Sequence, residues 1–314
     1  MRDILFVKTS SLGDVVHHMP AVTDAARHHP DRKLAWIVEE DFAPLARLHP
    51  AVGDVIPVAS RRWRSAPFSS STWNEIGALR AALRARPAET VIDTQGLIRS
   101  ALIVRGANGE KHGYDRRSIR EPLASSFYDV THTVSRALHA VTRNRTLTAL
   151  ALGYQPDATI DYGLPRSRPA AAAPYAILQH GTSRIAKEWR EVDWIGLGQW
   201  LAKRGLEVVL PWGTQAERVR SERLASAIKG SRILPRQPLD VTAQTFAGAS
   251  LVVGVDTGLL HLAAAYRVPL LAIFIATDPG LTGPVGSGPI KILDAKAQYP
   301  SFMRAIEAAE GLLG

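Results

Sequence analysis

The feature that most constrains the fold of this chain is a regular alternation of short apolar runs with longer amphipathic segments. Apolar runs of about four to eight residues, separated by helical patterns, are typical of buried strands joined by crossover helices. The first set of runs spans residues 3–9, 33–39, 54–59, 89–95 and 158–163, and the second spans 175–181, 206–213, 232–235, 250–258 and 269–276. The alternation predicts an α/β fold with parallel sheets.

A Pro/Ala-rich stretch, LPRSRPAAAAP at 164–174, interrupts this alternation and is typical of a linker. A chain of 314 residues is also longer than one core usually organises. We therefore expect an N-terminal domain over 1–165 and a C-terminal domain over 175–314. Two such domains facing each other would place the carboxyl ends of both sets of strands on one cleft. The amphipathic helix expected at 300–313 could pack back on the N-terminal domain.

Composition narrows the classes of function. The chain has no cysteine, so disulfides, thiolate catalysis and cysteine-bound metals are excluded. Its formal charge of +9 points to anionic partners: phosphorylated substrates, nucleic acid or an anionic membrane surface. We find no apolar run of about 18 residues that could span a bilayer, and the first residues are typical of a strand rather than a signal peptide. We expect a cytoplasmic protein.

The strongest local pattern is VVGVDTGLLHLAAA, at 252–265. A buried strand ends there, and Asp256, Thr257 and Gly258 open a helix. Free backbone N–H groups at a helix start, with a threonine hydroxyl beside them, form a ready anion site. His261 lies one turn into the helix and could face the same ligand. The alternative is that Asp256 or Thr257 only caps the helix and that His261 only packs.

Two further strands of the second half run into polar loops. In QHGTSRIAKEW, Thr182 and Ser183 can donate to phosphate oxygens, and Lys187 can reach a diphosphate as a mobile charge. In LPWGTQAE, Glu217 is placed to accept hydrogen bonds from ribose hydroxyls. Each feature alone could be a solvated loop or an exposed acid. Together with the helix start at 256–258, they predict a site for a nucleoside diphosphate.

The first half begins differently, with DILFVKTSSLGDVVHHMP at 3–20. A strand, a turn and a helix follow one another as in a dinucleotide-binding fold, but the turn holds a single glycine, Gly13, and a carboxylate, Asp14. The carboxylate would repel a phosphate, and G-x-G-x-x-G is missing, which disfavours an NAD-dependent oxidoreductase. His17 and His18 follow on the same helix, and we interpret them as surface or packing residues.

Basic residues cluster on the presumed loops of this half. Guanidinium groups recognise carboxylates and phosphates in a bidentate manner, so the clusters suggest an acidic second substrate with several charges. A plain solvated face is the alternative. The clusters contain Arg61, Arg62 and Arg64 in SRRWRS, Arg99 in DTQGLIRSA, and Arg116, Arg117 and Arg120 in YDRRSIREP.

Six stretches together make the sequence resemble the ADP-heptose:lipopolysaccharide heptosyltransferase family, in its heptosyltransferase I branch. They are VKTSSLGDVVHHMPAVTDA, DTQGLIRSAL, REPLASSFY, QHGTSRIAKEW, LPWGTQAE and VDTGLLHLAAA, and the resemblance runs almost end to end. It implies a GT-B fold: two Rossmann-like doubly wound domains, one binding the acceptor and the other the nucleotide sugar, with a cleft between them. It also implies transfer of L-glycero-D-manno-heptose from ADP-heptose to the Kdo of Kdo2-lipid A, with inversion and without a metal or other cofactor.

Carried over residue by residue, the resemblance makes Asp14 the catalytic base and Lys187 the phosphate partner. The donor would also meet Thr182, Ser183, Glu217, Gln237, Asp256, Thr257, Gly258 and His261. The acceptor would meet Ser10, Gly13, Arg61, Arg62, Arg64, Arg99 and Arg120. Two positions depart from the family pattern: Gln237 stands where an apolar residue such as Met is expected near the adenine, and Arg99 replaces a lysine.

Other functions stay open from the sequence. A heptosyltransferase II would act on an acceptor that already bears a heptose, and a non-catalytic nucleotide-sugar or nucleic-acid-binding protein could use the positive charge. Nucleic acid is disfavoured because the arginine clusters lack interleaved aromatic residues in a recognisable module. We see no pattern of acids and histidines at metal-ligand spacing. We expect a monomer that touches the inner face of the cytoplasmic membrane through the stretch RRWRSAPF.

Overall fold

The computed structural model describes residues 3–86, 88–166 and 173–314. The chain divides into two compact units, Met1–Gly163 and Leu164–Gly314. Of the linker expected at 164–174, residues 167–172 lie outside the described part of the chain.

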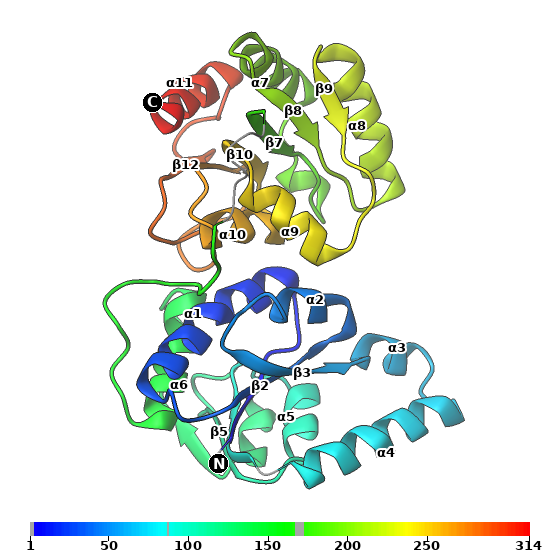
Figure 1. Cartoon of the computed structure of the whole chain (residues 1–314), viewed down its shortest axis with the longest axis vertical. Helices are drawn as coiled ribbons and strands as arrows, with labels where there is room; N and C mark the ends of the chain where they lie inside the picture. Colours follow the sequence, from blue (N-terminus) through cyan, green and yellow to red (C-terminus); the bar gives the residue numbers. More distant parts are fainter. Residues whose placement is uncertain (1–2, 87, 167–172) are drawn as a thin grey trace. The chain divides into compact units, whose positions relative to one another are not determined.

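The first unit is built on a six-stranded parallel sheet with the strand order β3-β2-β1-β4-β5-β6 (Figure 1). Its strands are β1 (Asp3–Val7), β2 (Leu34–Glu39), β3 (Val52–Val58), β4 (Ala88–Asp93), β5 (Glu110–Tyr114) and β6 (Val130–His132). Its helices are α1 (Leu12–His28), α2 (Ala43–Ala46), α3 (Ser60–Ser65), α4 (Ser70–Ala85), α5 (Ile98–Val104) and α6 (Ala140–Leu152), with 3-10 turns η1 (Glu40–Phe42) and η2 (Pro122–Phe127). The strand order reverses direction between β1 and β4, as in a doubly wound fold.

The second unit repeats this topology, because its sheet has the order β12-β11-β10-β7-β8-β9 with every pair parallel. Its strands are β7 (Tyr175–Gln179), β8 (Glu207–Leu210), β9 (Ser231–Ile233), β10 (Leu251–Val255), β11 (Leu270–Phe274) and β12 (Ile290–Asp294). Its helices are α7 (Glu191–Lys203), α8 (Gln215–Ala227), α9 (Leu239–Ala247), α10 (Gly258–Ala265) and α11 (Phe302–Leu313), with a 3-10 turn η3 (Ile185–Lys187). Here the reversal lies between β7 and β10. Two parallel six-stranded sheets with flanking helices confirm the α/β prediction.

The central strands are buried on both faces, which explains why their sequences are continuous apolar runs. Every residue of β1, β10 and β11 is buried, whereas the edge strands β3 and β12 are partly exposed. In the first unit α1 packs against α6, and a buried ion pair links the two helices: Arg145 Nε donates to Asp24 Oδ2 at 2.6 Å. Arg145 also donates to the carbonyls of Asp157 and Thr159.

The last helix, α11, belongs to the core of the second unit, and the expectation that 300–313 also packs on the first domain stays a prediction. Ala305, Ala308 and Ala309 are part of the apolar cluster that α7 forms with β10 and β11. Asp193 of α7 accepts the backbone N–H of Phe302 at 3.1 Å and so satisfies the start of α11. The apolar face of α11 is thus buried within the second unit.

The prediction of a strand at 158–163 is wrong, because this segment is not part of a sheet. Its polar groups have other partners: Arg145 binds the carbonyl of Thr159, and Asp161 pairs with Arg27. Three strands escaped the sequence analysis, namely β5 (EKHGY), β6 (VTH) and β12 (IKILD), which are short or rich in polar residues.

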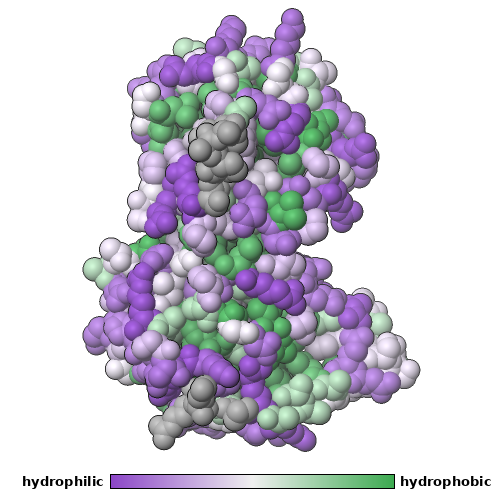
Figure 2. Space-filling model, in the orientation of Figure 1, coloured by the Kyte–Doolittle hydropathy of each residue, from purple (hydrophilic) through white to green (hydrophobic). Residues whose placement is uncertain are grey.

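Hydrophilic side chains cover most of the face seen in Figure 2, and hydrophobic ones gather in smaller groups. Among the helices of residues 3–86, 88–166 and 173–314, none has the length and apolar character needed to cross a membrane.

Candidate functional site

The residues singled out from the sequence gather at the carboxyl edges of the two sheets. In a doubly wound sheet, ligands bind outside the carboxyl ends of the strands where the strand order reverses. In the first unit that point lies between β1 and β4, which pair in register from Ile4 and Thr90 to Val7 and Asp93. In the second unit it lies between β7 and β10, which pair up to Gln179 and Gly254. Each unit therefore has one candidate site.

Asp14 lies in the first turn of α1, directly after β1. Its Oδ2 accepts the backbone N–H of Ser11 at 2.7 Å and the Ser11 hydroxyl at 3.0 Å, so the carboxylate is fixed by a capping box. Asp14 is half-buried, whereas the neighbouring Gly13 is buried. Only one carboxylate oxygen takes part in these bonds, and the side chain remains partly exposed at the carboxyl edge.

A second loop, after β4, fixes the loop that precedes Asp14. Gln95 Oε1 accepts the backbone N–H groups of Thr9 and Ser10, both at 3.0 Å. Arg99 Nη2 donates to the Ser10 hydroxyl at 2.8 Å. The Arg99 Nε is buried and has no partner among the described residues, so it is a free donor beside this loop. The structure thus brings together three of the predicted residues, Ser10, Asp14 and Arg99.

Two buried ionisable groups lie beneath these loops, and the sequence analysis missed both. Lys8 donates to the carbonyl of Thr94 at 2.9 Å, and burial lowers its pKa although Asp14 and Asp93 oppose this. Asp93 accepts the N–H groups of Gln95 and Gly96 and the hydroxyl of Tyr128; burial raises its pKa and these bonds oppose the rise. Both lie at or just after a strand end, where a polar residue follows an apolar run, and that position was the available signal.

The predicted acceptor arginines fall into two groups. Arg120 is exposed and precedes Glu121, which accepts the backbone N–H of Ile98 and donates its own to the carbonyl of Gly96, so Arg120 lies next to the segment that carries Arg99. Arg61 and Arg62 lie on α3 and already have acidic partners: Arg61 pairs with Asp41, and Arg62 pairs with Glu40 and Glu75.

The hydrogen bonds that Arg62 donates to Glu75 and Glu40 raise the pKa of Arg62. Arg64 is exposed and has no ion-pair partner in the described part of the chain. In this structure Arg64, Arg99 and Arg120 are therefore better placed than Arg61 or Arg62 to meet an external anion.

His17 and His18 are buried, in agreement with a packing role. The ring of His18 makes edge contacts with those of Phe6 and Trp36, with centroids 5.0 and 4.9 Å away, and its Nδ1 lies 3.2 Å from the Thr94 hydroxyl. Burial lowers the pKa of His18 well below its ordinary range.

In the second unit, Asp256 is the centre of the constellation. Lys187 Nζ donates to Asp256 Oδ2 at 2.6 Å, and the hydroxyl of Thr277 donates to the same oxygen at 2.7 Å. The Thr182 hydroxyl donates to the backbone carbonyl of Asp256 at 3.2 Å. The loops after β7, β10 and β11 thus converge, and Thr277 is a member of the cluster that the sequence analysis did not include.

The backbone N–H groups at the start of α10 are not capped by the neighbouring side chains and can therefore bind a ligand. Thr257 is the N-cap residue, yet its side chain makes no capping hydrogen bond, and the Asp256 carboxylate is turned to Lys187 and Thr277. The helix begins at Gly258, and His261 is buried one turn further on. A helix N-terminus with a lysine beside it is a site for a phosphate or diphosphate.

Glu217 has a structural role, the capping of α8, that the sequence analysis did not predict. Its Oε2 accepts the backbone N–H groups of Gly213 and Thr214, and its own N–H donates to the Thr214 hydroxyl, which forms the capping box of α8. A Cβ placed on Gly181 would lie 2.5 Å from Glu217 Oε1, so this oxygen lies against the loop that carries Thr182. Glu217 can therefore cap α8 with one oxygen and face the candidate site with the other.

This double role makes a specific prediction for two variants. Glu217→Gln keeps an oxygen for the cap and should leave the melting temperature unchanged, while weakening ADP binding about tenfold because a charged acceptor is lost. Glu217→Ala should weaken ADP binding as much and in addition lower stability by about 1 kcal/mol, since the cap is lost. Calorimetric titration with ADP and thermal unfolding check both. Unchanged ADP affinity in both variants would limit Glu217 to capping.

The remaining predicted donor residues lie at the edges of this arrangement. Gln237, on the loop after β9, donates to the Thr245 hydroxyl at 3.0 Å, and Ser183 is exposed on the loop after β7. Gln179, the last residue of β7, has a buried Oε1 without a partner among the described residues. Within residues 3–86, 88–166 and 173–314, no group of three or more His, Asp or Glu side chains is arranged to hold a metal ion.

Two doubly wound units, one with a fixed carboxylate and the other with a cationic helix start, are the architecture of the glycosyltransferases with the GT-B fold. The sequence profile of glycosyltransferase family 9 (heptosyltransferase) matches residues 76–308, and the chain belongs to this family.

Curated relatives and solved structures agree with this assignment. A protein of Escherichia coli K12 named lipopolysaccharide heptosyltransferase 1 is 46% identical over 289 residues, which cover 90% of this chain and 91% of that protein. A protein of the same name from Pseudomonas aeruginosa PAO1 is 46% identical over 294 residues, with 92% and 83% covered. Structures of the E. coli heptosyltransferase WaaC with ADP and with ADP-2-deoxy-2-fluoro heptose superpose with TM-scores of 0.93 and 0.90 at 41% identity, covering 99% and 98% of this chain and 99% of each structure.

Proposed function

We propose that this protein transfers L-glycero-D-manno-heptose from ADP-heptose to the Kdo of Kdo2-lipid A, with inversion at the anomeric carbon and without a metal. The observation that carries the proposal is the cluster at the start of α10, where Lys187 is held by Asp256 beside an uncapped helix N-terminus. This is the chemistry that a nucleoside diphosphate requires. The similarity to proteins named lipopolysaccharide heptosyltransferase 1 supports a heptose as the transferred sugar and a lipopolysaccharide precursor as the acceptor.

In this proposal the second unit binds the donor. The Lys187 ammonium, the hydroxyls of Thr182 and Ser183 and the N–H groups at the start of α10 stabilise the negative charge that develops on the departing ADP. His261, Thr257 and Gly258 line the diphosphate and heptose, Glu217 accepts from the ribose, and Gln237 lies near the adenine. When the diphosphate arrives, Lys187 exchanges part of its interaction with Asp256 for the new anion.

The first unit binds the acceptor and supplies the base. Asp14 takes the proton of a Kdo hydroxyl as that oxygen forms a bond to the anomeric carbon, and the bond from this carbon to the ADP oxygen breaks. The transition state has oxocarbenium character, as in related glycosyl transfer. The Kdo carboxylates and the lipid phosphates bind to arginines that have no acidic partner among the described residues, chiefly Arg64, Arg99 and Arg120, and Gly13 leaves room for the sugar.

The acceptor is tested directly with purified protein. We expect ADP release with ADP-heptose and Kdo2-lipid A, and turnover at least tenfold lower with the acceptor that already carries one heptose. The reverse preference would assign the chain to the heptosyltransferase II reaction instead. If neither acceptor supports ADP release while ADP-heptose still binds, the chain is a nucleotide-sugar-binding protein.

The proposed acceptor is a membrane lipid, so we place the protein at the inner face of the cytoplasmic membrane, acting as a monomer. The stretch that follows α3 supports surface contact: Phe68 is 97% exposed, and the unpaired Arg64 lies four residues before it. An exposed aromatic ring beside a free guanidinium suits the interface of an anionic bilayer.

A further inference from the structure

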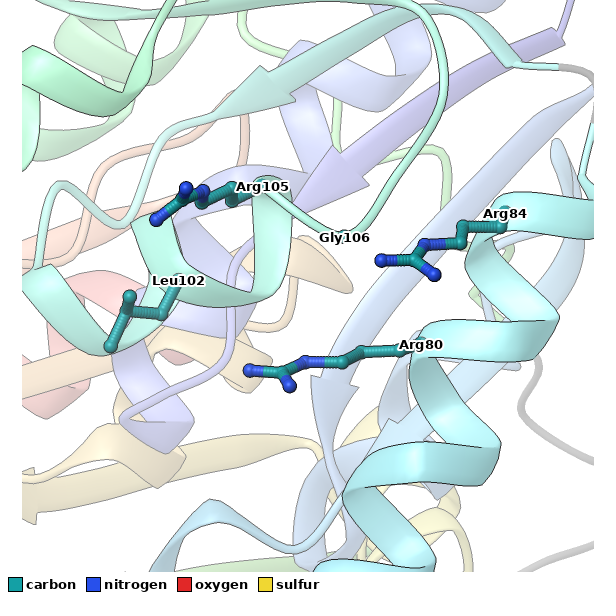
Figure 3. Close-up of a pocket in the computed structure, with 5 residues that line it drawn as sticks. All are labelled: Arg80, Arg84, Leu102, Arg105 and Gly106. Carbon is teal, nitrogen blue, oxygen red and sulfur yellow. The ribbon is translucent and has the colours of Figure 1, made fainter.

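A cavity of the first unit that shares no residue with either candidate site is lined by cations. It has a volume of about 320 Å3 and lies between the C-terminal part of α4 and the end of α5. Its lining residues are Arg80, Arg84, Leu102, Arg105 and Gly106. Figure 3 shows Arg80 and Arg84 extending from α4 toward α5. None of these residues belongs to the proposed transfer reaction.

The three arginines of the cavity have no acidic partner among the described residues. Arg61, Arg62 and Arg86 are each paired with a carboxylate. For Arg80 and Arg84, by contrast, no ion pair exists within the described residues, and the same holds for Arg105. Arg80 and Arg84 are also four residues apart on one helix, a spacing at which like charges repel.

The negative C-terminal ends of α4 and α5 offset only part of the positive charge of the three arginines. Arg84 lies in the last turn of α4, and Arg105 is the C-cap residue of α5, where the helix dipole favours a cation. Each helix C-terminus contributes about half a negative charge, so two ends offset about one of the three positive charges. About two positive charges remain, which matches the charge of a phosphoryl group.

The surroundings of the cavity are amphipathic. Leu102, which lines it, is 46% exposed, and Trp73 on α4 is 59% exposed. Trp73, Arg80 and Arg84 share one face of the helix, because positions seven and eleven residues apart align along an α-helix. Hydrophilic and hydrophobic side chains lie next to each other over the α3–α4 segment in Figure 2. Tryptophan at the level of headgroups and arginine on phosphate are typical of a bilayer interface.

We propose that the cavity between α4 and α5 binds the phosphoryl group of an anionic membrane lipid through Arg80, Arg84 and Arg105, with Trp73 and Leu102 resting on the bilayer surface. This inference deepens the proposed function, since a lipid acceptor requires a membrane-bound enzyme. It names a headgroup site that is separate from Asp14 and from the donor residues. Bidentate guanidinium groups would recognise the phosphate by shape as well as by charge.

The test is co-sedimentation with vesicles of phosphatidylcholine that contain phosphatidic acid, without donor or acceptor. We expect Arg80→Gln/Arg84→Gln to weaken vesicle binding at least tenfold. The matched control is Lys203→Gln/Lys229→Gln, which removes two exposed charges from the second unit and should bind as the wild type does. All four residues changed are exposed, and thermal unfolding should confirm that each variant folds.

A second double variant distinguishes a specific phosphate site from nonspecific electrostatic attraction to the membrane. Arg80→Lys/Arg84→Lys keeps the charge but loses the planar fork, and we expect it to bind vesicles several-fold less well than the wild type. Wild-type binding by the lysine variant, or an equal loss in the control, would overturn the proposal. Binding of inorganic phosphate without any vesicle binding would overturn the lipid as its source. Because no transfer is measured, failure here leaves the proposed reaction untouched, and turnover on a detergent-dispersed acceptor should stay normal in all these variants.

Discussion

Asp14→Asn is expected to lower turnover about 10²- to 10⁴-fold, the range that a positioned general base contributes. The amide keeps an oxygen that can accept the backbone N–H of Ser11, so the capping box that fixes this side chain survives. What is lost is the capacity to take a proton from the acceptor hydroxyl. ADP-heptose affinity should not change, because the donor residues all lie in the second unit.

The measurements are ADP release at saturating substrates and calorimetric titration with ADP-heptose. Ser11→Ala is the control: it removes the hydroxyl that donates to Asp14 Oδ2 at 3.0 Å but leaves the carboxylate, and should cost no more than a few-fold. Turnover of Asp14→Asn within about threefold of the wild type would remove Asp14 from the mechanism.

Lys187→Ala is expected to lower turnover about 10²- to 10³-fold, as removal of one donor from a developing anion does. Two effects act together. The departing diphosphate loses its cation, and the Asp256 carboxylate, which is 17% exposed, loses its ion pair and keeps only the Thr277 hydroxyl. An uncompensated carboxylate would then lie beside the diphosphate and repel it.

A double variant separates these two effects. Lys187→Ala/Asp256→Asn removes both charges, so it should recover part of the turnover lost in Lys187→Ala, and the difference measures the coupling between the two residues. The apparent affinity for the lipid acceptor should change little in either variant. A defect of Lys187→Ala confined to acceptor binding would contradict its role toward the donor.

Most of the fold could be predicted from the sequence because the central strands are buried on both faces. Such strands appear as continuous apolar runs, as β1 and β10 do, and the pattern is visible without knowledge of their neighbours. The edge strands β6 and β12 were missed because an edge strand needs no such run, and the inner strand β5 was missed because its sequence, EKHGY, is largely polar. The segment 158–163 was misassigned because its alternation resembles a strand, while Arg145 and Arg27 provide its partners.

The candidate sites could be predicted only in part, for a similar reason. Residues next to a strand end, such as Asp14 and Asp256, are visible in the sequence because a polar group follows an apolar run. Contacts between segments that are distant in the chain are not visible in the sequence. Neither the pairing of Thr277 with Asp256 nor the support that Gln95 gives to Ser10 follows from any local pattern. The acidic partners of Arg62 are equally invisible in the sequence, which made this arginine look available.

The two sheets have the same strand order, and each closes its own core within its own half of the chain. All proposed donor residues lie after position 164, and the proposed base and the acceptor arginines lie before it. A change in nucleotide-sugar preference can therefore arise without disturbing the recognition of the lipid, and the reverse is also true. A chimaera joined at Gly163 and Leu164 would inherit its sugar from one parent and its acceptor from the other.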